Sequence, residues 1–347
     1  RYGYNFLLYY IGVVAMFVMA TLLLLPLLRL CRVYQLSSLA DVLTFRFRSS
    51  WVGATTTLAM CITLLPLLAL QIQAVADSIH ILSGQTIGSS SAGERQDRLA
   101  LFFCLIITVF SILFGTRHVS AQDRNNGLVT AIAFESLVKL GAMFVLMLAA
   151  IFAVFGGIAE MDQWLAQNAE LHRALERPMQ GDSARALLLV FFAGAVCMPH
   201  LFHMAFAENT DSGHLRKATW GLPSYLLLLS LPILPITWAG IKLGHGLPMD
   251  YSGLAIGSAL HSLPVSAAAF VAGLSAASAT IIVTTLALAN MCINHLFLPT
   301  GVLQIDREQS VYIQLKWLRR SLIAALIMAG SGFFMLLSGT HSLNQLA

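Results

Sequence analysis

A proline interrupts an apolar run of membrane-spanning length at Phe191–His203, FFAGAVCMPHLFH, which also carries Gly194, His200 and His203. Proline has no backbone N–H, so the carbonyl one turn earlier loses its partner, and lipid offers no replacement. Such a break survives mainly beside a cavity or binding site, although packed helices also tolerate plain kinks. Both interpretations of Pro199 therefore remain open on these residues alone.

The composition around this stretch indicates a membrane protein. Of the 347 residues, 58% are hydrophobic and 10% are charged, whereas about a quarter are charged in soluble domains. Eight runs approach or exceed the ~20 residues that span hydrocarbon: Phe6–Leu28, Trp51–Ala76, Leu99–Gly115, Gly127–Phe155, Ala186–Ala207, Ala218–Ile241, Ser262–Asn294 and Ser321–Ser338. We predict an all-α integral membrane protein with about eight transmembrane helices.

The basic residues lie in short loops between these runs, so the net charge of +4 does not indicate a nucleic-acid partner. The loops after the first, third, fifth and seventh runs together hold twelve lysines and arginines, and the opposite set holds seven. The positive-inside rule then predicts that the N-terminus of this chain lies outside. The loops with Asp41, Asp123, Asp211 and Asp306 are expected in the cytoplasm.

The cysteines and the known catalytic fingerprints indicate neither a metal centre nor an active site. The five cysteines are scattered and lack CxxC spacing, so we expect free thiols without a disulfide framework or zinc site. A transition-metal site at Cys197, His200 and His203 would lack a carboxylate or fourth ligand. Because nucleophile, zinc-protease, phosphate-loop and dinucleotide motifs are missing, we expect no catalysis and no cofactor within this chain.

Two groups of polar residues fall inside apolar runs. Glu135 and Lys139 are four residues apart, so they share one helix face in the favourable order for an intramembrane ion pair. They form either a proton or substrate relay, or a structural pair. Gln71 and Gln73 bring amides into the second run, and one is expected to face the bundle, where it binds a polar solute or a neighbouring helix.

The seventh run has a face of small residues at helical spacing, from Gly273 to Thr284. Small faces allow close helix packing. Alternatively, the hydroxyls of Ser278 or Thr280, with backbone carbonyls, offer the oxygen ligands that Na+ prefers.

Two connecting segments are expected to form short helices. SLADVLTFRFRSS (Ser38–Ser50) places Asp41 where it can cap a helix ahead of two headgroup-anchoring arginines. MDQWLAQNAELHRAL, in the external loop 156–184, has an apolar face of Met161, Trp164, Leu165 and Leu171. This segment is either a surface helix or a gate.

Several stretches resemble the sodium/solute symporter family: SLADVLTFRFRSS, LQIQAVADSI, the Pro-His pair of the broken helix and the small-residue helix. More closely, Phe114–Leu140 and Met198–Leu229 look like the symporter-like membrane domains fused to bacterial hybrid sensor histidine kinases. The resemblance spans about residues 1–320. Residues 1–347 are therefore expected to form one symporter-like transmembrane domain, a fragment whose flanking helices and kinase module lie outside.

The resemblance implies a LeuT-type bundle of two inverted repeats, incomplete in this chain, with solute and Na+ held between two broken helices. The first run looks like the family's third helix, so Ala186–Ala207 would be the second broken helix. The solute-binding residues implied are Gln71, Gly194, Pro199, His200 and His203.

The chain departs from the symporter pattern at two positions. Symporters usually have an arginine three residues after the Pro-His histidine, where this chain has His203. The family's sodium motif falls on Ala276, Ala279 and Thr280, or one residue earlier on Ser275, Ser278 and Ala279; either alignment loses one hydroxyl. Na+ remains a possible coupling ion with Ala276, Ser278, Ala279 and Thr280 as its candidate residues.

The expected function is therefore a membrane solute transport or sensing domain in the bacterial inner membrane. It would bind a small organic solute, such as an amino acid or carboxylate, and signal to a cytoplasmic histidine kinase of the same polypeptide in a two-component pathway. The alternative is a free-standing Na+/solute symporter without a kinase. A structural membrane anchor for the kinase is the third class.

Overall fold

The computed structural model describes residues 7–83, 90–115, 126–168, 171, 173, 181–209, 211–244, 247–300 and 311–338. The chain divides into two compact units that alternate along the sequence. Unit 1 comprises Arg1–Arg29, Leu137–Met198 and Thr210–Ala272, and unit 2 comprises Leu30–Ser136, Pro199–Asn209 and Gly273–Ala347.

Regular structure in the described part of the chain is helical. The α-helices are α1 (Leu7–Val18), α2 (Leu24–Val33), α3 (Leu39–Phe47), α4 (Ser50–Leu82), α5 (Ser90–Gly115), α6 (Asn126–Leu148), α7 (Ile158–Gln167), α9 (Gly181–Cys197), α10 (Pro199–Phe202), α11 (Ser212–Ser230), α12 (Ile233–Leu243), α13 (Ser252–Ala259), α14 (Leu263–Cys292) and α15 (Val311–Ser338). Three π-helical turns continue directly from α6, α10 and α14, respectively: η3 (Ala149–Phe155), η4 (His203–Ala207) and η6 (Ile293–Phe297). The 3₁₀ turns are η2 (Met19–Thr21) and η5 (Met249–Tyr251).

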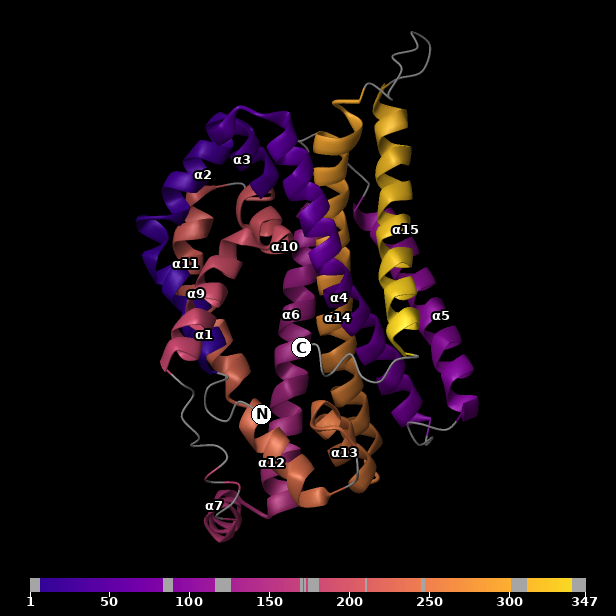
Figure 1. Ribbon diagram of the computed structural model, residues 1–347. Helices are drawn as coiled ribbons and strands as arrows, with labels where there is room; N and C mark the ends of the chain where they lie inside the picture. The colour runs from indigo at the N-terminus through magenta and orange to yellow at the C-terminus, as the bar shows by residue number, and fades with distance from the viewer. Residues whose placement is uncertain are drawn as a thin grey trace. The chain divides into compact units, whose positions relative to one another are not determined.

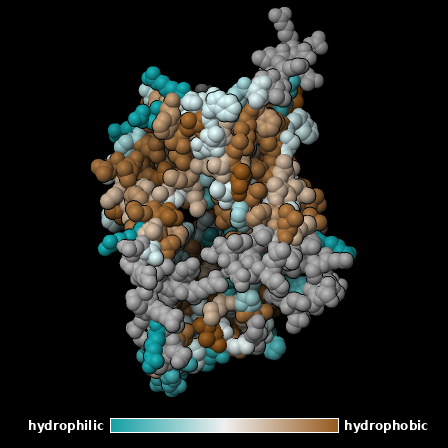
Figure 2. All heavy atoms as spheres, viewed as in Figure 1, coloured by the Kyte–Doolittle hydropathy of each residue, from teal (hydrophilic) through white to brown (hydrophobic). Residues whose placement is uncertain are grey.

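Five of these helical stretches are long and apolar enough to cross a membrane, and two bent helix pairs raise the number to seven if each pair is one span. The five are Ser50–Leu82, Gly127–Phe155, Ser212–Leu243, Leu263–Phe297 and Ile313–Leu336. Their outer surfaces carry large apolar side chains such as Leu137, Trp220 and Leu263. Much of the face in Figure 2 is correspondingly hydrophobic. The chain is thus a multi-pass helical membrane protein.

The predicted spans overlap these stretches, with one exception. The run Leu99–Gly115 lies on α5, whose apolar part, Arg98–Leu113, is shorter than the others. The eighth span therefore stays a prediction. The last predicted span begins too late, because α15 starts at Val311. That helix contains Lys316, Arg319 and Arg320, which are among the basic residues predicted to lie in the loop after the seventh run.

The first predicted span, Phe6–Leu28, is not one straight helix. It consists of α1 with η2, followed by α2, and the two parts are bent by 65°. Pro26 explains the position of the bend, because its ring displaces the carbonyl of Leu22 and it cannot donate to that carbonyl. Sequence analysis expected only one broken span in this chain, and the described residues contain two.

Unit 1 contains close packing of α1 on α9 and α11. Gly12 permits the α1–α9 contact, because a Cβ at that position would lie 2.8 Å from the Phe191 Cβ. A second cluster joins η3, α12 and α13 around Phe155, Trp238 and Ile256. The apolar face predicted for the loop 156–184 packs against this cluster, which confirms a short amphipathic helix at α7. Residues 174–180 of that loop lie outside the described part.

Unit 2 is built on α4, α5 and α15, which pack on one another, and on the buried second part of α14 (Figure 1). Its core contains Leu68 and Ile72 of α4, Ile281 of α14 and Ile323 of α15. Gly330 lies against α4, since an added Cβ would be 3.0 Å from the Leu68 Cβ. The helices of unit 2 thereby hold the polar groups described next.

Candidate functional site

The predicted break is present between α9 and α10, which are bent by 49°. Met198 N–H donates to the Gly194 carbonyl (3.1 Å), which is the last regular helical bond before the break. Pro199 has no N–H to continue the series, so the Ala195 carbonyl loses that partner. The break therefore has the chemical cause expected from the sequence.

A π-helical turn follows the break directly. In η4 the Glu208 N–H donates to the His203 carbonyl five residues earlier (3.0 Å). Single π-turns inside helices occur frequently at functional sites. The turn begins at His203, which is buried together with Phe202 and Phe206. Pro199 and the π-turn thus give this short segment two departures from regular helix.

The segment contains a buried acid–imidazole contact. His203 Nε2 lies 3.3 Å from Glu208 Oε1, and the side chains of the two residues are 6% and 7% exposed. Arg319 of α15 is also buried and interacts electrostatically with Glu208. Burial of charged groups is unfavourable unless they are paired, so these three residues form a mutually dependent set.

His200 differs from His203 in its surroundings. Its Nδ1 atom is buried, and no group in the described part of the chain hydrogen-bonds to it. A buried polar atom without a partner costs about 1 to 3 kcal/mol relative to a satisfied one. The break consequently presents an imidazole nitrogen that a polar solute or a water molecule can satisfy.

The end of the broken helix is tied to α2. Arg32 Nη2 donates to Asn209 Oδ1 (3.3 Å) and to the Asn209 carbonyl (3.4 Å). Asn209 Nδ2 in turn donates to the Ala205 carbonyl in η4 (3.2 Å). These contacts fix the position at which the chain leaves the π-turn.

The remaining predicted solute residues are placed as follows. Gln71 lies half-buried on α4, and its neighbour Gln73 has a buried amide oxygen without a hydrogen-bond partner among the described residues. Gly194 belongs to unit 1, whereas Gln71, Pro199, His200 and His203 belong to unit 2. A Cβ at Gly194 would meet nothing within 4 Å, so close packing does not require a glycine there.

The predicted ion-binding helix brings hydroxyls to a carboxylate of α6. Ser278 Oγ donates to Glu135 Oε1, and Ser275 Oγ donates to the Glu135 carbonyl (3.1 Å). Thr280 instead donates to the Ala276 carbonyl of its own helix (2.8 Å). Ala276 and Ala279 flank this group on α14 and contribute no side-chain oxygen.

Glu135 and Lys139 lie four residues apart on α6, as predicted. Ser278 is a partner of Glu135 that sequence analysis did not anticipate. The predicted Glu135–Lys139 ion pair stays a prediction.

A second buried polar network connects the start of α3 to η6, the π-turn that follows α14. His295 Nε2 lies 2.8 Å from Asp41 Oδ1, and the Ser37 hydroxyl and N–H both donate to Asp41 Oδ2 (2.8 and 2.9 Å). Asn294 Nδ2 donates to the Ser37 hydroxyl (3.3 Å). We call these four residues the Asp41–His295 network.

Gly53 lets the first turns of α4 approach this network. A Cβ at this position would overlap Thr44 Oγ1 and His295 Nδ1, so a larger residue would displace the histidine. Ser38 is the N-cap of α3, since its hydroxyl accepts from the Asp41 N–H (3.1 Å). Our expectation that Asp41 caps this helix was wrong, because its carboxylate reaches back to Ser37.

The electrostatics of Asp41 follow from these contacts. Burial alone raises the pKa of this carboxyl, but the hydrogen bonds from His295 and Ser37 and the nearby imidazole outweigh burial. The pKa of Asp41 is therefore lowered below its ordinary value, and the group is a carboxylate at neutral pH.

Sequence analysis missed two buried polar residues of α4 and one long-range pair. Asp77 and His80 lie three residues apart at the end of α4, and both are buried. Their helical spacing at the edge of an apolar run was a usable signal. No sequence pattern indicated the pairing of Asp41 with His295, because the two residues are far apart in the sequence.

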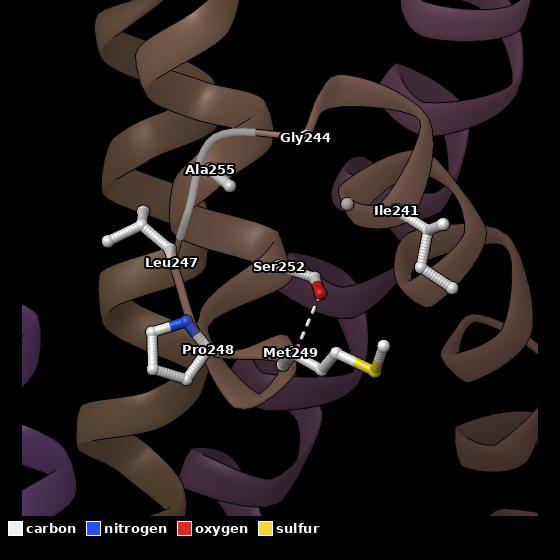
Figure 3. Close-up of a pocket in the computed structure, with 8 residues that line it drawn as sticks. Ile241, Gly244, Leu247, Pro248, Met249, Ser252 and Ala255 are labelled. Carbon is white, nitrogen blue, oxygen red and sulfur yellow. Dashed lines mark hydrogen bonds between the residues drawn. The ribbon is translucent and has the colours of Figure 1, made fainter.

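Unit 1 contains a cavity of about 250 Å³ between the end of α12 and the start of α13 (Figure 3). It is lined by Gly240, Ile241, Gly244, Leu247, Pro248, Met249, Ser252 and Ala255. The Ser252 hydroxyl donates to the Met249 carbonyl (2.6 Å). None of the predicted solute or ion residues lines this cavity.

Comparisons with known proteins identify no relative. No family model, no curated protein and no solved structure matches the chain.

Proposed function

We propose that this chain is a solute-binding membrane domain that reports a small organic solute to a cytoplasmic histidine kinase. It would belong with the sodium/solute symporter-like sensor domains and adopt part of a LeuT-type bundle with eight spans. The solute would be an amino acid or another small carboxylate. The domain would lie in the bacterial inner membrane with its first residue outside.

The observation that carries this proposal is the buried Nδ1 of His200, which has no hydrogen-bond partner among the described residues and lies directly after a proline break in an apolar helix. Breaks of membrane helices create backbone and side-chain groups that protein, water or a ligand must satisfy. Transporters place solutes at such breaks. An imidazole nitrogen can accept from the ammonium group of an amino acid or donate to a carboxylate.

A binding experiment tests the proposal. The chain, reconstituted in nanodiscs, is titrated with radiolabelled amino acids and organic acids. We expect saturable binding of one chemical class, which His200→Ala weakens about tenfold or more, because one lost polar contact is worth about 1.4 kcal/mol. The exposed His214 of α11 supplies the matched control, and His214→Ala leaves affinity unchanged. Absence of binding across the whole panel would refute the proposal.

A free-standing Na+/solute symporter is the second candidate. It is favoured by the oxygen atoms that gather around Glu135, where Ser275 and Ser278 both donate from α14. Hydroxyl, carboxylate and carbonyl oxygens are hard ligands suited to Na+. This function predicts that Na+ raises solute affinity and that Ser278→Ala removes the effect. Solute binding that is the same in Na+ and choline salts contradicts it.

The two functions also differ in what the whole polypeptide contains. Sensory and phosphoacceptor modules encoded after residue 347 would support the sensor, and further helices followed by a stop would support the symporter. For the sensor, solute addition changes autophosphorylation of the full polypeptide. An unchanged phosphorylation level at saturating solute would exclude the signalling function and would be consistent with the transport function.

A further inference from the structure

Two cysteines from distant parts of the sequence lie in contact in unit 2. Cys61 of α4 and Cys292, the last residue of α14, have their sulfur atoms 3.5 Å apart. All five cysteines of the chain are free thiols in this structure. The contact joins two long helices that both span the membrane by length and composition.

The surrounding packing holds the two sulfur atoms close together. Leu64 of α4 packs with Leu288 and Met291 of α14, within one turn of the two cysteines. A disulfide has an S–S bond of about 2.05 Å, so the sulfurs need to approach by roughly 1.5 Å. Rotation about the Cα–Cβ bond of each cysteine (χ1) swings its sulfur atom through a distance of this size without a backbone movement.

The route to the pair runs through the bilayer. Cys292 is 5% exposed, whereas Cys61 is half-buried and lies on the same helix as Leu58 and Ile62, which are 49% and 66% exposed. Exposed apolar residues of a membrane-spanning helix face lipid. An oxidant that reaches Cys61 must therefore dissolve in the membrane.

We propose that Cys61 and Cys292 are a redox modification site that a membrane-soluble quinone oxidises to a disulfide. The two S–H bonds break and one S–S bond forms. The two electrons and two protons pass to the quinone, which leaves as the quinol. The proposal is independent of the identity of the solute and of whether a kinase follows.

The disulfide would act on the polar network described above. Cys292 precedes η6 directly, and His295 in that turn pairs with Asp41 of α3. A covalent link between α4 and α14 would hold the first turns of α4 and the π-turn in one arrangement. Oxidation would therefore restrain any movement of α3 and η6 relative to α4.

The test uses the full chain in nanodiscs containing a short-chain ubiquinone analogue under anaerobic conditions. We expect the number of titratable thiols to fall from five to three. Peptide mass spectrometry should find one reducible cross-link, between the peptides with Cys61 and Cys292. Cys61→Ser and Cys292→Ser should each abolish the cross-link, and Cys104→Ser should leave it intact.

Three outcomes would overturn the proposal. The first is an unchanged thiol count after incubation with the quinone. The second is a cross-link between any other pair of cysteines. The third is cross-linking by the doubly charged oxidant tetrathionate, which does not enter the bilayer, but not by quinone, which would show that access runs through water. The thiol count and the peptide mass spectrometry of the unmodified chain distinguish these outcomes even if a serine variant fails to fold.

Discussion

The Asp41–His295 pair allows a quantitative prediction for Asp41→Ala. Asp41 Oδ1 lies 2.8 Å from His295 Nε2, and Asp41 Oδ2 accepts from the Ser37 hydroxyl and N–H at 2.8 and 2.9 Å. A hydrogen bond to a charged group contributes about 1.5 to 3 kcal/mol, and the local Ser37 bonds contribute roughly 0.5 to 1 kcal/mol more after water replaces the carboxylate. We expect Asp41→Ala to lower the free energy of unfolding by about 3 kcal/mol.

Most of this loss of unfolding free energy comes from leaving His295 without its acceptor. The side chain of His295 is only 8% exposed, so water cannot fully replace the lost acceptor at its Nε2. Asp41→Asn keeps the shape and one acceptor oxygen, and it should cost about half as much. Ser38→Ala removes the N-cap of the same helix without touching His295, and it should cost about 1 kcal/mol. It therefore serves as the matched control.

The assay is reversible unfolding in mixed micelles with increasing dodecyl sulfate, followed by tryptophan fluorescence. A double-mutant cycle with His295→Ala isolates the pair, and we expect a coupling energy of at least about 1.5 kcal/mol. A coupling energy below about 0.5 kcal/mol would refute the reasoning, because it would mean that the two residues do not depend on each other.

The same pair predicts a dependence on pH. The pKa of Asp41 is lower in the folded than in the unfolded chain, so the unfolded chain binds this proton more tightly. The stabilisation is fully present above the ordinary carboxyl value of about 4 and is lost as the pH falls through the lower folded value. Asp41→Asn should show a smaller loss of stability in this acid range than the unmodified chain, and equal losses would contradict the prediction.

Two further substitutions, Gly12→Ala in unit 1 and Ser278→Ala in unit 2, are each compared with a control variant. Gly12→Ala should destabilise unit 1 by about 1 to 3 kcal/mol, because the added Cβ would lie 2.8 Å from the Phe191 Cβ. Gly221→Ala is the control. Its added Cβ would have nothing within 4 Å, so the alanine should stabilise α11 by roughly 0.5 to 1 kcal/mol. Thermal unfolding of both variants distinguishes these signs, and a shift in the same direction would contradict the close packing. Ser278→Ala removes a donor to the Glu135 carboxylate and should cost about 1 to 3 kcal/mol, measured in the same way against Ser278→Thr, which keeps the hydroxyl. Equal stability of the Ala and Thr variants would show that this hydrogen bond is not formed.

Local chemistry made part of the fold predictable. Uninterrupted apolar runs identify membrane helices because the bilayer imposes one length and forbids unpaired backbone groups. Pro199 gave the position of the main break, and the apolar face of residues 161–171 gave the docking of α7. Pro26 carried an equivalent signal for the bend between α1 and α2, which we did not use.

The sites were harder to predict because their partners come from distant residues. Asp41 has a local role that the sequence suggests, a helix cap, and the structure assigns that role to Ser38. Its actual partner, His295, depends on how α14 ends and on the small size of Gly53. Ser278 could be listed as an oxygen donor from its hydroxyl alone. Its contact with Glu135 is a property of packing and follows from no spacing rule.

The π-turns determine where this chain can lose a single residue without changing the direction of the side chains that follow. Each residue of an α-helix turns the chain by about 100°, and a π-turn accommodates one extra residue. His203 opens η4 and His295 lies inside η6. Deleting one residue from either turn would therefore restore a regular helix and leave the residues beyond it in their present rotational register, whereas the same deletion in a regular helix would rotate everything beyond it by roughly 100°. Only side chains inside the turn would be displaced, so single-residue deletions in these two turns should be tolerated better than single-residue deletions in the regular helices.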